Sequence, residues 1–78
     1  MTYITVMATT EKVEGTLLEA YRLNAAQILS IRDLGSYSVS IQQEDGLLEF
    51  ESPICEIKLP GLIFYASGVA DELLARTR

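Results

Sequence analysis

Apolar and polar residues alternate on both sides of Asp45-Gly46, over the stretch from Tyr37 to Ile54. Because successive side chains of a strand point to opposite faces, each alternating run predicts a strand with one apolar face. Asp-Gly between two such runs favours a tight hairpin turn of type I′, since glycine takes the required positive φ without strain. We therefore predict a β-hairpin that turns at Asp45-Gly46.

The position of this turn also predicts which residues pair across the hairpin. The expected pairs are Gln43–Leu48, Gln42–Glu49, Ile41–Phe50 and Ser40–Glu51. One face then holds the apolar side chains, namely Tyr37, Val39, Ile41, Leu48, Phe50 and Ile54. The other face holds the polar ones, namely Ser38, Ser40, Gln42, Glu49 and Glu51. A slip by one residue would mix the two sets. Proline cannot donate to a ladder, so Pro53 should end this strand or lie at an edge or bulge.

Two further segments have strand patterns. Thr2 to Thr9 alternates and is rich in β-branched and aromatic residues, and a polar connection follows from Thr10 to Gly15. Cys55 to Ala66 predicts a second hairpin, because proline and glycine suit the two central positions of a turn at Leu59-Pro60-Gly61-Leu62. A wider loop is the alternative, since such a turn splays the strands. The expected pairs are Leu59–Leu62, Ile57–Phe64 and Cys55–Ala66.

The stretch from Leu17 to Leu34 is compatible with two structures. A helix is favoured by local propensity, by a capping box that begins at Thr16, and by Gly35 just beyond the end. The alternative is a strand from Leu17 to Leu23, a bend over residues 24–26 and a second strand from Gln27 to Asp33. At the C-terminus, Ser67 to Arg78 predicts a short helix with Ser67 as its cap. Its apolar stripe would contain Val69, Leu73 and Leu74.

Composition limits the class of protein. Seventy-eight residues form one domain, residues 1–78, and 49% of them are hydrophobic. So small a chain has little volume far from solvent, which makes a homodimer or a protein partner plausible. The net charge is −5 and histidine is absent. This acidic balance opposes direct nucleic-acid binding and an anionic membrane surface, and it permits a basic protein partner or serves solubility.

Cysteine usage and hydropathy predict a cytoplasmic setting. Cys55 is the only cysteine, so it can form neither an internal disulfide nor a zinc site. No apolar run reaches the roughly 20 residues of a membrane helix, and the start of the chain lacks the basic segment of a signal peptide.

No catalytic, cofactor-binding or metal site is expected. The absence of histidine excludes the usual triads and imidazole ligands, and isolated glycines do not make a phosphate loop. Cys55 is expected to be a small buried side chain on a strand. Carboxylates are densest around the first hairpin. They form either a solvated face or a face that binds a basic partner. The apolar strand Leu62-Ile63-Phe64-Tyr65 suits a central position or a subunit contact. The candidate partner-binding residues are Glu44, Asp45, Glu49, Glu51, Phe64 and Tyr65.

A resemblance to known proteins lies in the run YRLNAAQILSIRDLGSYSVSIQQEDGLLEFESPICEI, which covers about half of the chain. It resembles small all-β regulatory modules and is similar to FlbD-type flagellar proteins. Part of it, ILSIRDLGSYSVSIQQEDG, is similar to the strands of LytTR-type response-regulator DNA-binding domains. The residues that carry the resemblance are Asn24, Ile28, Ile31, Tyr37, Ile41, Asp45, Gly46, Glu51, Ser52 and Ile57.

The resemblance implies an all-β fold and a regulatory role of bacterial or phage type. LytTR-type domains contact DNA through basic and polar loop residues, and this chain has few cations, so DNA binding is not implied. We therefore predict a mainly β domain of five or six strands, a small barrel or curled sheet with a short C-terminal helix. The alternative is an α+β fold with residues 17–34 as a helix packed on the sheet.

The expected function is that of a non-enzymatic protein-interaction or regulatory module, cytoplasmic and homo-oligomeric. An alternative is a small acidic inhibitor that mimics the charge of nucleic acid and blocks a nucleic-acid-binding protein.

Overall fold

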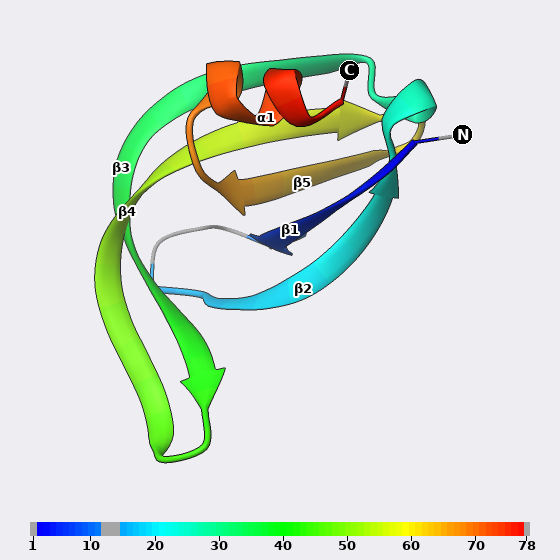
Figure 1. The fold of residues 1–78 in the computed structure, drawn as a ribbon. Coiled ribbons are helices and arrows are strands. Elements are labelled where there is room, and N and C mark those ends of the chain that lie inside the picture. Colours follow the sequence, from blue (N-terminus) through cyan, green and yellow to red (C-terminus); the bar gives the residue numbers. More distant parts are fainter. Residues whose placement is uncertain (1, 12–14, 78) are drawn as a thin grey trace.

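The fold is a closed ring of five strands with a short C-terminal helix, as seen in a computed structural model that describes residues 2–11 and 15–77 (Figure 1). The elements are β1 (Tyr3–Thr9), β2 (Leu17–Asn24), the 3₁₀ turn η1 (Ala25–Gln27), β3 (Ser30–Gln43), β4 (Gly46–Leu59), β5 (Leu62–Ser67) and α1 (Ala70–Arg76). Neighbours in sequence pair in order, and β5 returns to β1. All pairs are antiparallel except a short parallel contact between β2 and β3. The mainly β prediction is confirmed.

The stretch from Leu17 to Leu34 is β structure, so the helical alternative is wrong. Residues Leu17–Asn24 pair along β1, and the chain then bends through η1. The Asn24 side chain accepts a hydrogen bond from the Ala26 backbone N–H at 3.0 Å, which stabilises this bend. Tertiary pairing has overridden a local helix propensity that amounts to only tenths of a kcal/mol per residue.

The first hairpin forms, and its predicted register is wrong by two residues. Ile41 pairs with Leu48 and Val39 with Phe50. Glu44 and Asp45 are the turn residues, and Gly46 follows them with φ of 124°. Among the described residues only glycines have positive φ, which excludes the type I′ turn at Asp45-Gly46. A turn followed by glycine at positive φ is the other common hairpin loop.

A shift of two residues preserves which side chains share a face, because the period of a strand is two. Val39 and Ile54 are accordingly buried, and Glu49 and Glu51 are exposed. Ser40, predicted on the polar face, is also buried. Its N–H donates to the Thr16 carbonyl at 3.2 Å, where β2 comes alongside β3 and covers it.

The second hairpin has the predicted register. Cys55 pairs with Ala66, Ile57 with Phe64, and Leu59 with Leu62 across a tight turn. The predicted first strand is also confirmed as β1, and Ile4, Val6 and Ala8, which share one of its faces, are buried. Of the predicted connection from Thr10 to Gly15, residues 12–14 lie outside the described residues.

Two apolar clusters fill the ring. The larger one contains ten buried residues, among them Ile4, Ile57, Phe64 and Leu73, and the smaller one contains Leu18, Val39 and Ile54. One half of β3 packs against each cluster. The register between β3 and β4 shifts where these halves meet, at a bulge between Asp33 and Gly35, and Gly35 has φ of 107°. Bulges bend and twist a strand. In Figure 1, β3 and β4 accordingly bend strongly: one half of each strand belongs to the ring, and the other half projects from it as a hairpin.

The C-terminal helix lies on the side of the molecule away from the hairpin tip (Figure 1). It is shorter than predicted, and its predicted cap is wrong. Ser67 belongs to β5, where its hydroxyl lies 2.6 Å from the Ser52 hydroxyl. The Asp33 carboxylate accepts from the Ala70 N–H at 2.9 Å instead.

The predicted apolar stripe of this helix is only partly correct. Ala70 and Leu73 are buried, whereas Val69 and Leu74 are exposed. Arg78, the predicted last residue, lies outside the described residues. In the part of the chain that the structure describes, no helix is long and apolar enough to cross a membrane.

Candidate functional site

The part of the molecule that carries most of the predicted site is the far half of the β3–β4 hairpin, which we call the projecting hairpin (residues 38–53). Here β3 and β4 pair continuously from Ser38–Glu51 to Gln43–Gly46. The strand β2 accompanies β3 only at Ser40 and Ile41, and β5 joins β4 only from Ile54 onward. Figure 1 shows the outer end of the hairpin standing clear of the other strands.

The four predicted carboxylates all lie on this hairpin and are all exposed. Glu44 and Asp45 form the turn, and Glu49 and Glu51 follow on β4. Because Glu49 and Glu51 are two residues apart on one strand, they point to the same face, about 7 Å apart. Their cross-strand partners are Ser40 and Ser38, which are uncharged.

No cation offsets this charge from within the hairpin. The sequence contains no lysine or arginine between Arg32 and Lys58. Arg32 is engaged with Glu56 at 3.3 Å, on the half of the sheet that lies over the larger apolar cluster. The projecting hairpin is therefore a purely acidic extension of the fold.

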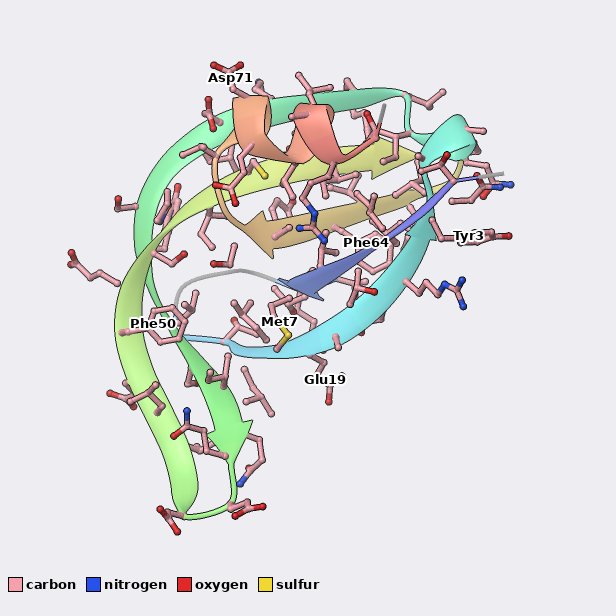
Figure 2. The ribbon with its side chains drawn as sticks, viewed as in Figure 1. Tyr3, Met7, Glu19, Phe50, Phe64 and Asp71 are labelled. Carbon is pink, nitrogen blue, oxygen red and sulfur yellow. The ribbon has the colours of Figure 1, made fainter. Side chains whose placement is uncertain are left out.

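Apolar side chains accompany the carboxylates. Leu47 and Leu48 follow the turn and are 61% and 44% exposed, one on each face of the hairpin. Nearer the ring, Ile41 and Phe50 are half-buried against the smaller apolar cluster. Figure 2 shows the Phe50 ring beside β4, on the side that faces the rest of the molecule. Leu48 was predicted on the core-facing side, and Leu47 was not identified from the sequence as an exposed apolar residue beside the carboxylates.

The two aromatic candidates lie in a different place, on β5. Phe64 lies within the ring of strands and is buried (Figure 2). Its aromatic ring contacts that of Tyr21, with centroids 4.7 Å apart. Tyr65 is half-buried against the smaller apolar cluster. Phe64 thus serves the core, as its predicted pairing with Ile57 implies, and the structure does not bring either aromatic ring to the carboxylates.

A second apolar surface lies at the β4–β5 turn. Leu29 and Leu62 are 66% and 45% exposed there, and both line a groove of about 530 Å³. Ile63 and Tyr65 form part of the same lining. Leu29 was not identified from the sequence as an exposed apolar residue.

Cys55 is a fully buried free thiol. Burial, and secondly the Asp33 carboxylate, raise the pKa of the Cys55 thiol to about 11 from its ordinary value of 9.0. The thiol points to the Ala66 carbonyl at 3.7 Å. A thiolate is the nucleophilic form, so this environment disfavours chemistry at the sulfur.

The described residues contain no group of three or more acidic, cysteine or histidine side chains that could hold a metal ion. Besides the groove at the β4–β5 turn, a second cavity of about 300 Å³ lies beside Thr9, Glu11 and Glu19. Neither of these two cavities is lined by Glu49 or Glu51.

Comparison with known proteins gives no relative: no family model, no curated protein and no solved structure matches the chain. The resemblance to small regulatory modules stays a prediction from the sequence.

Proposed function

We propose that this protein is a non-enzymatic interaction or regulatory module that binds a basic protein partner through its projecting hairpin. The observation that carries the proposal is the placement of Glu44, Asp45, Glu49 and Glu51 on an extension of the fold that contains no cation. Unpaired charges of one sign attract an oppositely charged partner and speed its association.

The magnitudes indicate that charge is one part of the binding. An exposed ion pair contributes about 0.2–1 kcal/mol, so four such pairs supply no more than a few kcal/mol. A dissociation constant near 1 μM corresponds to about 8 kcal/mol. The exposed side chains of Leu47 and Leu48 lie on the same hairpin and can supply apolar contact area.

The test compares two double variants with the same change in net charge. Glu49→Gln with Glu51→Gln removes two charges from the hairpin, and Glu11→Gln with Glu72→Gln removes two exposed charges from outside the hairpin. Proteins captured from a bacterial lysate by the immobilised wild type at low and high salt are identified, purified and titrated against each variant. The hairpin variant should bind about twofold to thirtyfold more weakly, and the control should bind like the wild type at equal salt.

Two results would contradict the proposal. One is a binding constant that does not change with salt concentration, because exposed charges are screened. The other is an equal loss of affinity in the two double variants, which would mean that only the total charge matters. Sedimentation of the free protein in the same buffers also tests the expectation of a homo-oligomer.

A second candidate function is inhibition by mimicry of nucleic-acid charge. The spacing of about 7 Å between Glu49 and Glu51, with no cation nearby, favours it over a neutral interaction surface. It requires that the captured partner binds nucleic acid and that a DNA oligonucleotide competes with this protein for it. If the partner binds DNA and this protein at the same time, charge mimicry is excluded, and the proposal of an interaction module is unaffected.

A further inference from the structure

The strand β4 has an open edge over Gly46–Ser52. On one side these residues pair with β3. On the other side, β5 begins to pair only at Ile54, opposite Ser67, and no strand of the described chain pairs before that point. In an edge strand alternate N–H and C=O groups point outward without a partner. This open edge extends for about 20 Å, at roughly 3.3 Å per residue.

The open edge ends at a defined place. Pro53 has no N–H, and its carbonyl accepts a hydrogen bond from the Gly68 N–H at 2.8 Å. A backbone group of β1 has a side-chain partner instead of a strand. The Arg76 guanidinium of α1 donates a hydrogen bond to the Thr5 carbonyl. The β1 edge thus has a side-chain donor from α1, whereas no strand pairs with the Gly46–Ser52 edge in the described part of the chain.

A second copy of this chain does not fit the open edge. Two copies paired antiparallel through it would place Glu49 and Glu51 beside the same residues of the other copy. Like charges on neighbouring strands repel, and the hairpin contains no lysine or arginine that could offset them. The occupant must therefore carry positive charge where this edge carries negative charge.

The side chains along the edge specify the pattern of the occupant. Glu49 and Glu51 are exposed on one face, and Leu48 and Phe50 lie on the other. Neighbouring strands place their side chains on shared faces, so a matching strand alternates basic with apolar residues. We propose that the β4 edge binds an extended segment of a partner protein, with alternating basic and apolar residues, as an added strand.

This inference rests on the proposed function, and a peptide experiment separates the two. The probe is a synthetic peptide that alternates lysine and valine, and its control has the same composition in blocks. Two further peptides carry N-methyl groups, one on every lysine and the other on every valine backbone nitrogen. In an added strand only alternate N–H groups face β4, so one methylated peptide removes the docking donors and the other is its matched control.

The alternating peptide should bind more tightly than the block peptide and lose affinity with salt and with Glu49→Gln/Glu51→Gln. One of the two methylated peptides should bind at least about tenfold more weakly than the other, since several backbone hydrogen bonds are lost together. Amide hydrogen exchange should slow over Leu47–Glu51 when the unmethylated peptide binds.

Equal binding by the two methylated peptides, or no binding of the alternating peptide, would overturn strand addition. If equal binding still depends on Glu49 and Glu51, the acidic interaction surface stands without strand addition. Binding that ignores both salt and the two carboxylates would overturn the proposed function as well.

Discussion

Replacement of Leu73 by alanine tests whether the C-terminal helix is an integral part of the core. Leu73 is 2% exposed and belongs to the larger apolar cluster with residues of β1, β4 and β5. Its neighbour Leu74 is 39% exposed. The two leucines lie side by side in the same helix, so Leu74→Ala is a matched control for changes in helix propensity.

The expected magnitudes differ several-fold. A buried Leu→Ala substitution loses transfer free energy and leaves a cavity, at a cost of about 2–5 kcal/mol. A domain of this size has a free energy of unfolding of roughly 4–12 kcal/mol, so this loss is a large fraction of the total. The partly exposed Leu74 should cost about 1 kcal/mol or less when it is truncated.

The assay is equilibrium unfolding in urea, followed by tyrosine fluorescence and by circular dichroism. If Leu73→Ala fails to fold, Leu73→Met keeps most of the volume and should cost less than about 1.5 kcal/mol. Equal losses for Leu73→Ala and Leu74→Ala would refute the reasoning, because they would mean that α1 does not insert Leu73 into the core in solution.

Two further predictions concern Asp33 and Cys55. Asp33→Ala should lower the free energy of unfolding by about 1 kcal/mol, since it removes the acceptor of the Ala70 N–H. Asp33→Asn keeps an acceptor oxygen and should retain most of that stability. Equal losses for the two variants in urea unfolding would contradict the capping role. The raised pKa of the Cys55 thiol stabilises the fold below pH 9.0, and this contribution is lost as the pH rises toward about 11. The difference in unfolding free energy between the wild type and Cys55→Ala should therefore shrink over that interval, and a constant difference would refute the assignment.

The second hairpin could be predicted to the residue because its turn was placed correctly, with Pro60 and Gly61 as the two turn residues and Gly61 at φ of 73°. The first hairpin could be predicted only in its existence and its faces. Registers that differ by two residues sort side chains identically, so the alternation could not distinguish them. The choice was made by the turn, where Gly46 follows the two turn residues instead of being one of them.

The helix cap shows a different limit of the sequence. Capping by the nearest serine is a local rule, and Ser67 satisfied it. The carboxylate that actually accepts from Ala70 is Asp33, 37 residues earlier in the chain. Only the pairing of β3 with β4 and of β4 with β5 brings these residues together. A contact that depends on the whole sheet cannot be inferred from either segment alone.

In the candidate site too, features set by local alternation could be predicted, and features set by the whole sheet could not. The exposure of Glu49 and Glu51 followed from alternation and could be predicted. The open edge beside them could not, because it depends on where β5 stops pairing with β4, which is set by Ser67 at the end of β5. Leu47 was likewise assigned no role, since its exposure arises from the turn that the structure chose.

The composition of the projecting hairpin indicates more than protection of an edge. Charged side chains prevent edge strands from pairing with copies of themselves, and lysine does this at least as well as glutamate. A mixture of both signs would protect the edge without producing a field at a distance. The hairpin instead carries carboxylates alone, over the whole interval between Arg32 and Lys58. Under the proposed function, the charges that would repel a second copy would also attract a basic strand, so protection from self-association and selection of a partner would be one property of this edge.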